Sequence, residues 1–274
     1  MPELPEVETI SRDLNQHITG STIANVTIYD GRNLRNINET EFKKGTESSS
    51  ILNVYRLGKV CVWNLSNENS LLFHLRMTGK FIIQGKNPNK EKHSMLKFST
   101  NKENIIFEDI RKFATINLIK TKELKSNSYV QKIGIDPTTP EFTLLKLGKI
   151  IKNIPNKNLK QLLLEQNHLV GIGNIYASEI LFESQISPQR LAKSLTKEEI
   201  KNLYIAIKNI LQKAIELRGT TFSDYRDGFN KKGGFQNKLK VYNKYTQNCI
   251  ICNNKISKIK QNGRSTFYCE NCQK

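Results

Sequence analysis

Four of the five cysteines in this 274-residue chain lie near its end, in two Cys-x2-Cys pairs. The pairs are Cys249/Cys252 and Cys269/Cys272, and sixteen residues separate them. Two such pairs at this separation predict a tetrahedral zinc site with four thiolate ligands. Because all four ligands come from the protein, no position remains for a bound water, and we expect the zinc to be structural. The last part of the chain therefore has to fold around a metal ion.

The residues between the two pairs predict a β-hairpin. Asn262-Gly263 is the favoured two-residue hairpin turn, with strand-like residues 255–261 before it and 264–268 after it. Arg264 follows the turn directly, on a backbone that the metal holds. On its own it is an ordinary exposed arginine, but in a basic protein a guanidinium at such a tip favours a contact with phosphate.

The formal net charge of +18 and the isoelectric point near 9.6 favour a polyanionic partner. Nucleic acid is favoured over a membrane surface. Part of this excess also fits an AT-rich genome, because the chain is rich in Lys, Asn and Ile. No apolar run approaches the roughly 20 residues of a membrane-spanning helix, and no basic region followed by an apolar stretch opens the chain. We therefore expect a cytoplasmic protein without a membrane partner. In a reducing compartment, clustered cysteines indicate metal rather than disulfides.

The chain changes character between residues 125 and 140, which predicts two large domains. Residues 3–16 have apolar side chains at helical spacing. Eight β-branched and aromatic runs predict a β-sandwich or barrel: 22–29, 51–57, 59–65, 70–74, 80–83, 95–99, 104–108 and 114–118. Beyond these, candidate helices occur at 142–150, 157–166, 173–184 and 196–218. Residues 219–237 read as a long loop, and loops of that length are usually functional or disordered.

The second residue, Pro2, is a candidate nucleophile. Removal of Met1 is expected before a residue as compact as proline, and it leaves Pro2 with a free secondary amine. An α-amino group has a pKa of about 8, so a useful fraction is unprotonated at neutral pH. Such an amine can form a Schiff base with a carbonyl carbon, and Glu3 beside it can act as an acid or a base. Many proteins have proline at this position, so the rest of the chain has to support the interpretation.

Two further segments are candidates for contact with phosphate. The run Gly171-Ile172-Gly173-Asn174 places a glycine turn at the start of a helix. Backbone N–H groups there favour an anion, and Asn174 adds a side-chain donor. Lys59 follows Gly58 at the start of a strand, where apolar neighbours would hold it rigidly. Each segment also has a plainer interpretation, as a glycine that lets helices approach and as a solvated surface lysine.

Together these motifs resemble the bacterial formamidopyrimidine-DNA glycosylase family, whose members excise oxidised purines. The resemblance runs from Met1-Pro2-Glu3-Leu4-Pro5-Glu6 through the turn at 171–179 to the four cysteines, in the family's order and spacing. It implies an α+β fold, with an N-terminal β-sandwich domain that includes an N-terminal helix, a helix-two-turns-helix domain and a β-hairpin zinc finger. The implied domains are 1–130, 131–238 and 239–274, with a lesion-capping loop at 219–237.

The resemblance also implies roles for single residues. Pro2 is the nucleophile and Glu3 the neighbouring acid, while Lys59 is a proton donor in β-elimination. Arg264 serves δ-elimination and binds phosphate. Contacts with DNA are implied for His74, Met77, His93, Arg111, Phe113, Lys160 and Asn174. In this set, Met77, Arg111 and Phe113 match the trio that fills the gap left by a flipped base, and we call these three residues the wedge.

The wedge segment departs from the family pattern at three positions. Ile110 stands where many members have proline, Ala114 where glycine usually follows the aromatic residue, and Arg76 where some members have glycine. We therefore expect a wedge of different shape or rigidity. Since residues 227–235 of the loop are also irregular, the sequence specifies the chemistry better than the base that is removed.

The implied activity is that of a bifunctional glycosylase and AP lyase of base excision repair, acting on double-stranded DNA with a damaged base. It needs one structural zinc and no small-molecule cofactor, and we expect a monomer. Two alternatives stay open. An endonuclease VIII-like enzyme for oxidised pyrimidines shares the Pro-Glu terminus, although the string that follows it, residues 4–8, favours the purine enzyme. A damaged-DNA-binding protein without catalysis is the other, and the intact Pro2, Glu3 and Lys59 argue against it.

Overall fold

The computed structural model describes residues 1–85 and 92–274. In this part of the chain two compact units form. The N-terminal unit comprises Met1–Gln131 and Leu217–Gln236, and the C-terminal unit comprises Lys132–Glu216 and Asn237–Lys274. The division after Gln131 lies in the region where the sequence changes character. The segment Leu217–Gln236, however, belongs to the N-terminal unit and not to the helical part that precedes it in the sequence.

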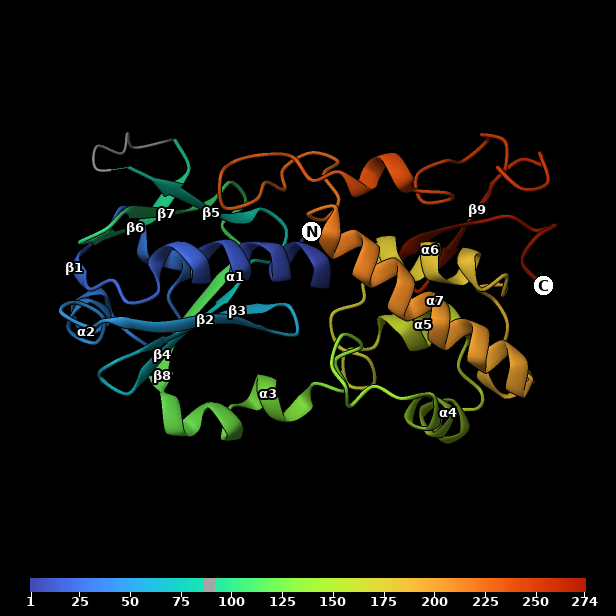
Figure 1. The fold of residues 1–274 in the computed structure, drawn as a ribbon, viewed down its shortest axis with the longest axis horizontal. Helices are drawn as coiled ribbons and strands as arrows, with labels where there is room; N and C mark the ends of the chain where they lie inside the picture. Colours follow the sequence, from blue (N-terminus) through green and yellow to red (C-terminus); the bar gives the residue numbers. More distant parts are fainter. Residues whose placement is uncertain (86–91) are drawn as a thin grey trace. The chain divides into compact units, whose positions relative to one another are not determined.

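Two four-stranded antiparallel sheets form the N-terminal unit (Figure 1). The first has the order β2-β3-β4-β8, with the strands β2 (Ile51–Leu57), β3 (Val60–Leu65), β4 (Asn69–His74) and β8 (Thr115–Lys120). The second has the order β1-β6-β7-β5, with the strands β1 (Ile23–Ile28), β6 (Ser94–Thr100), β7 (Asn104–Asp109) and β5 (Gly79–Gln84). All eight coincide with runs predicted from the sequence, apart from small shifts at their ends. The β-sandwich is confirmed.

Short helices accompany these strands. They are η1 (Gly31–Asn33), α2 (Glu39–Lys44), η2 (Thr121–Ser126) and α3 (Ser128–Lys132). Every helix in the described residues is too short or too polar to span a membrane.

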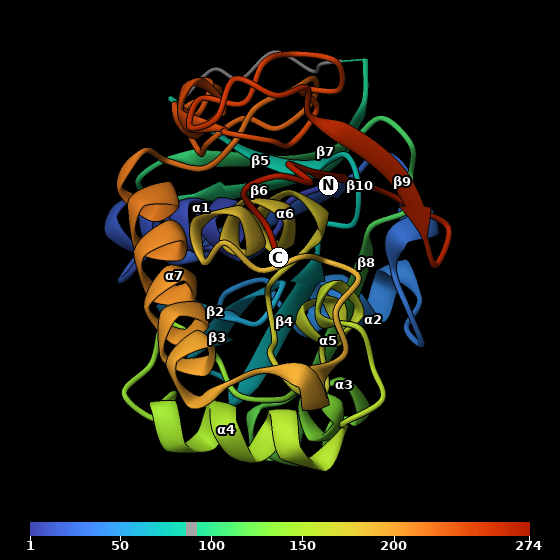
Figure 2. The ribbon, with the colours of Figure 1, turned by 90° about the vertical axis from the view of Figure 1, so that its right-hand side faces the viewer.

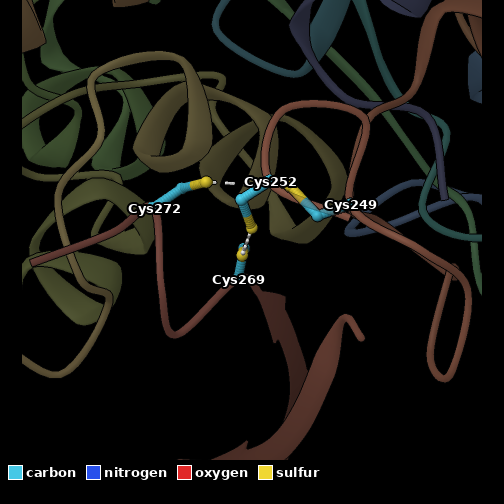
Figure 3. Close-up of side chains that lie close together, drawn as sticks. All are labelled: Cys249, Cys252, Cys269 and Cys272. Carbon is cyan, nitrogen blue, oxygen red and sulfur yellow. Dashed lines mark hydrogen bonds between the residues drawn. The ribbon is translucent and has the colours of Figure 1, made fainter. Parts of the chain in front are cut away.

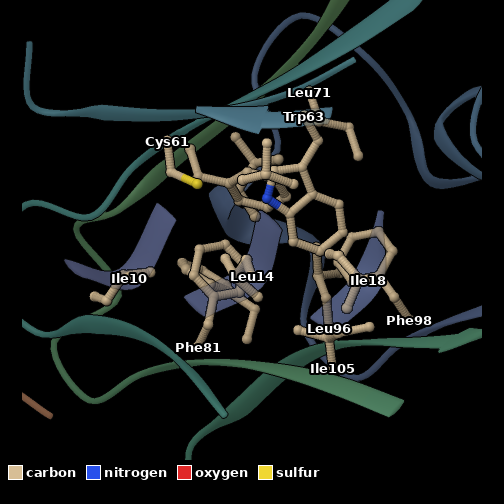
Figure 4. Packing of buried hydrophobic residues seen from close by; sticks show 14 of the residues in the cluster. Ile10, Leu14, Ile18, Cys61, Trp63, Leu71, Phe81, Leu96, Phe98 and Ile105 are labelled. Carbon is tan, nitrogen blue, oxygen red and sulfur yellow. The ribbon is translucent and has the colours of Figure 1, made fainter. Parts of the chain in front are cut away.

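The core of the N-terminal unit lies between its sheets and the helix α1 (Leu4–Ile18) (Figure 4). Apolar side chains at helical spacing bury one face of α1: Val7, Ile10, Leu14 and Ile18. Trp63 of β3 lies over this face, and its ring centroid is 5.5 Å from that of Phe81 and 5.1 Å from that of Phe98. Full burial of each large apolar side chain contributes about 1.5–3 kcal/mol. This packing fixes α1, and with it the first residues of the chain, in the unit.

The C-terminal unit combines helices with a hairpin. Its elements are α4 (Leu144–Asn153), α5 (Leu159–Leu164), α6 (Asn174–Glu183), η3 (Ala192–Ser194), α7 (Lys197–Glu216), β9 (Ser257–Gln261) and β10 (Arg264–Tyr268), while η4 (Phe235–Lys238) precedes the hairpin. α6 is buried around most of its circumference, as expected for a central helix. It packs against α5, α7 and β10, and Figure 2 shows it between α7 and the β9–β10 hairpin. The predicted helix–turns–helix element therefore forms, with the residues 165–173 between α5 and α6.

Candidate active site

The first residues of the chain lie inside the N-terminal unit, at the start of α1. Pro2 is buried and Glu3 is 3% exposed, whereas Met1 is 48% exposed. Glu3 is the N-cap of α1, and its backbone N–H donates to Oε2 of Glu6 at 2.8 Å as part of a capping box. These contacts fix the backbone on which the Pro2 amine would lie once Met1 has been removed.

Glu6 also holds the start of the 219–237 loop. Its Oε1 accepts the backbone N–H of Thr220 at 2.7 Å, and the residue is 1% exposed. Gly219 has a φ of +78°, and a Cβ atom there would lie 2.7 Å from the same oxygen. Only glycine combines this backbone conformation with so close an approach. One buried carboxylate therefore contacts both the segment beside Pro2 and the loop.

An ion-pair network anchors the same loop to α1. Nη2 of Arg218 lies 2.5 Å from Oδ2 of Asp13 and 2.7 Å from Oδ2 of Asp227. The backbone N–H of Gly228 also donates to Oδ2 of Asp13, at 3.1 Å. Both carboxylates are buried, and a buried charge is tolerated only when it is paired. These contacts explain why Leu217–Gln236 belongs to the N-terminal unit.

Lys59 lies in the two-residue turn between β2 and β3 and is 7% exposed. Gly58, the first residue of this turn, has a φ of +62°, as a type II′ turn requires. At the end of β4, burial and the charges of Arg76 and Lys59 lower the pKa of His74 to about 4. Nδ1 of His74 accepts the backbone N–H of Arg76 at 3.2 Å. The ring is therefore neutral at pH 7, and any contact it makes with a phosphate is a hydrogen bond from Nε2.

The structure brings the three wedge residues together. Nη1 of Arg111 lies 3.1 Å from Sδ of Met77, and its guanidinium carbon lies 4.9 Å from the centre of the Phe113 ring. Met77 is 41% exposed and Phe113 is 53% exposed, a large exposure for adjacent apolar side chains. Of the departures from the family pattern, Ile110 is 44% exposed and Ala114 is fully buried. Ile110 thus adds apolar surface beside the wedge.

Asp109 joins the two segments that carry the wedge. Its Oδ1 accepts the hydroxyl of Thr78 at 2.5 Å, and its Oδ2 accepts the backbone N–H of Ala114 at 2.7 Å. The backbone N–H of Arg111 in turn donates to Oγ1 of Thr78 at 3.0 Å. His93 contributes its backbone carbonyl, which accepts the N–H of Asp109 at 3.2 Å. Because Asp109 is fully buried, these bonds are shielded from water and hold both segments in one arrangement.

In the C-terminal unit, Lys160, Asn174 and Arg264 lie around β10. Nδ2 of Asn174 donates to the backbone carbonyl of Ser265 at 2.9 Å, and Nζ of Lys160 donates to Oγ1 of Thr266 at 3.3 Å. Arg264 is exposed at the first position of β10. Lys160, by contrast, is 1% exposed, so its ammonium group lies inside the unit and not at the surface, where the resemblance implies a phosphate contact. Lys160 and Asn174 both hold the strand that presents Arg264.

The four cysteines are arranged to bind one zinc ion (Figure 3). All four Sγ atoms lie within 4.8 Å of one another, with 3.8 Å between Cys249 and Cys272 and 3.4 Å between Cys252 and Cys269. Four sulfurs placed tetrahedrally at about 2.3 Å from a zinc ion are about 3.8 Å apart. The donor atoms and their spacing therefore fit the structural zinc that the sequence predicts. Because one pair precedes β9 and the other follows β10, the metal fixes both ends of the hairpin.

Several residues that hold the site in place were not predicted from the sequence. Glu6 carries a usable signal, because a glutamate three residues after an N-cap is the spacing of a capping box. Asp109, Asp13 and Arg218 carry no such signal, since each has a partner that is distant in the chain, as in the pairs Asp109–Thr78 and Asp13–Arg218. Only the folded structure shows which buried charges meet.

Comparisons with known proteins point to one family. Family models described as "Formamidopyrimidine-DNA glycosylase N-terminal domain", "Formamidopyrimidine-DNA glycosylase H2TH domain" and "Zinc finger found in FPG and IleRS" match residues 1–116, 133–226 and 247–274. The chain is 42% identical over 274 residues to the formamidopyrimidine-DNA glycosylase of Carboxydothermus hydrogenoformans. It is 40% identical over 277 residues to that of Rickettsia bellii, and both alignments cover 100% of each chain.

Similar solved structures are complexes of the Lactococcus lactis protein with DNA. A complex of a mutant with DNA that contains Fapy-dG has a TM-score of 0.92 and 34% identity. A complex with abasic-site DNA has a TM-score of 0.91 and 34% identity, and one with DNA that contains an oxidised pyrimidine has 0.91 and 33%. Each comparison covers 99% of both chains.

Proposed function

The chain belongs to the formamidopyrimidine-DNA glycosylase family, and we propose that it is a bifunctional DNA glycosylase and AP lyase of base excision repair. Its substrate is duplex DNA with an oxidised purine, such as 8-oxoguanine or a formamidopyrimidine. The observation that supports this best is the Pro2-Glu3 terminus at the buried start of α1, within a family match that extends over the chain. We place the enzyme in the cytoplasm as a monomer.

The reaction begins at Pro2. The damaged nucleotide is flipped out of the duplex, and the unprotonated Pro2 amine attacks C1′ of its sugar. The bond from C1′ to the base breaks and the base leaves. Glu3 takes up the proton that the nitrogen loses and passes it to the ring oxygen. The bond from C1′ to the ring oxygen breaks as that oxygen is protonated, and the nitrogen lone pair then forms the iminium ion.

The strand is then cut by two eliminations. The iminium ion acidifies the C2′ proton, whose removal expels the 3′ phosphate, and a second elimination expels the 5′ phosphate. Lys59 is the proton donor in the first elimination, and Arg264 serves the second. A zinc ion held by the four cysteines would have no open position for substrate, so its role would be structural.

The wedge fills the space that the flipped nucleotide leaves. Met77 and Phe113 are exposed apolar side chains that can restore contact with the neighbouring bases, and Arg111 can hydrogen-bond the base left unpaired. The contacts of Arg111 with both partners support a wedge that is assembled before DNA binds. His74 and His93 are further DNA contacts.

Phosphate contacts come from Lys59, Asn174 and Arg264. Arg264 is exposed, and its planar guanidinium can bind a phosphate through two bonds. Lys160 supports this surface from inside, because its ammonium group holds β10 next to Arg264. It enters the proposal as a residue that acts through Arg264.

Borohydride trapping on two duplexes tests the activity and its base preference. A duplex with 8-oxoguanine should give a covalent protein–DNA adduct at a higher rate than a duplex with 5-hydroxycytosine. A higher rate on 5-hydroxycytosine would favour the oxidised-pyrimidine enzyme, a possibility that the Lactococcus lactis complex with oxidised-pyrimidine DNA keeps relevant. No adduct on either duplex, together with tight binding, would favour a non-catalytic damage-binding protein.

A further inference from the structure

The turn that presents Lys59 is tied to α1 on one side. Nη1 of Arg56 donates to the backbone carbonyl of Gly58 at 3.2 Å, and Nε of Arg56 donates to Oε2 of Glu8 at 2.7 Å. The side chain of Arg56 is 4% exposed, so solvent screens this pair little. One half of the turn is therefore connected to the helix that follows Pro2.

Tyr129 of α3 holds the other side of the turn. Its hydroxyl oxygen accepts the backbone N–H of Lys59 at 3.1 Å and lies 3.5 Å from the carbonyl oxygen of Leu57, to which the hydroxyl donates. The Tyr129 ring packs against an apolar cluster formed by Val60, Val62 and Leu72. It also meets the ring of His74 edge to face, with 6.1 Å between the ring centroids. A single side chain thus bridges the end of β2 and the start of β3.

The position of Tyr129 in the sequence does not predict its contact with the Lys59 turn. It lies in residues 117–132, between the two long family-model matches at 1–116 and 133–226. The backbone N–H of Tyr129 donates to Oδ1 of Asn127 at 3.0 Å, which fixes the start of α3 under the turn. The segment between the two matches therefore contacts the Lys59 turn directly and does not only connect the two units.

We propose that Tyr129 is a positioning residue for Lys59. Its hydroxyl fixes the backbone from which the Lys59 side chain reaches the sugar, so it controls the elimination step without touching the DNA. The proposal rests on the proposed role of Lys59 in β-elimination. Since Lys59 is 7% exposed, its side chain has little freedom to compensate for a displaced backbone. Loss of one such hydrogen bond should slow the dependent step roughly three- to tenfold.

Tyr129→Phe tests this, because it removes the hydroxyl and keeps the ring. Tyr55→Phe is the matched control, since Tyr55 packs against the same apolar cluster but its hydroxyl bonds Asn64. Two single-turnover rates are measured for each protein. One is base excision from 8-oxoguanine duplex, read after alkali treatment, and the other is direct strand incision at a preformed abasic site. The ratio of the two rates is independent of how much protein is folded.

Tyr129→Phe should slow incision roughly three- to tenfold and leave excision within about twofold of the parent. Tyr55→Phe should leave the ratio unchanged. An unchanged ratio for Tyr129→Phe, or an excision rate that falls as much as incision, would overturn the proposal for Tyr129. Absence of both activities in the parent protein would instead overturn the proposed function, so the two failures are distinguishable.

Discussion

Substitutions at Lys160 and Arg264 should differ in their effect on the salt dependence of DNA affinity. Each phosphate that a protein cation neutralises contributes about −0.9 to the slope of log K against log salt. Between 50 and 200 mM salt, one such contact changes affinity by about 3.5-fold. Arg264 is exposed, so Arg264→Gln should make the slope shallower by about 0.9. Lys160 is 1% exposed, so Lys160→Met should leave the slope unchanged.

Lys160→Met should still weaken binding, by the same factor at every salt concentration. Nζ of Lys160 donates to Ser178 at 2.9 Å and to Thr266 at 3.3 Å, and each lost bond costs about 0.5–1.5 kcal/mol in the placement of β10. Those two bonds correspond to a loss in affinity of about 5-fold to 150-fold.

Titration of damaged and undamaged duplex at four salt concentrations, followed by fluorescence anisotropy, separates the two cases. Parallel lines for Lys160→Met and a shallower line for Arg264→Gln are the expected pair of results. A slope for Lys160→Met that is shallower by about 0.9 would refute the reasoning, because it would show that the ammonium group reaches a phosphate in the complex.

Substitutions at Phe113, Glu6 and His74 test the remaining contacts around the site. Phe113→Ala should slow excision from 8-oxoguanine duplex while leaving incision at an abasic site nearly unchanged, and equal losses would point to a general packing role. Glu6→Gln should slow excision by about tenfold or more, because an amide cannot accept both backbone N–H groups; excision at the parent rate would count against a role for this carboxylate. The pKa of His74 is lowered to about 4, so protonation favours the unfolded chain, and stability to urea should fall as pH decreases from about 6.5 toward 4. His74→Gln should remove part of that decrease, and an unaltered pH profile would contradict the assignment.

Local patterns predicted much of the fold. The strands were predicted from runs of β-branched and aromatic residues. The zinc site was predicted from the type and spacing of its ligands. Both patterns can be recognised in a short stretch of sequence. The placement of Leu217–Gln236 with the N-terminal unit could not be predicted in this way. It depends on Arg218 meeting Asp13, about two hundred residues earlier in the chain.

The candidate site shows the same division. Pro2, Glu3 and the wedge are recognisable as residue types in order along the chain. The burial of Lys160 is not recognisable, because a lysine in an amphipathic helix gives no sign of hydroxyl partners on α6 and β10. The role of Tyr129 could not be predicted for a related reason. Its hydroxyl contacts backbone atoms, and every residue has these whatever its side chain.

The proposed mechanism requires that the Pro2 amine forms the covalent intermediate. The direct measurement is borohydride trapping of the mature protein on 8-oxoguanine duplex, followed by proteolysis and mass spectrometry of the peptide that carries the DNA. The adduct should lie on the peptide that begins at Pro2, and a chain extended ahead of Pro2 should form none. An adduct on an internal lysine such as Lys59, or full excision by the extended chain, would rule out Pro2 as the nucleophile.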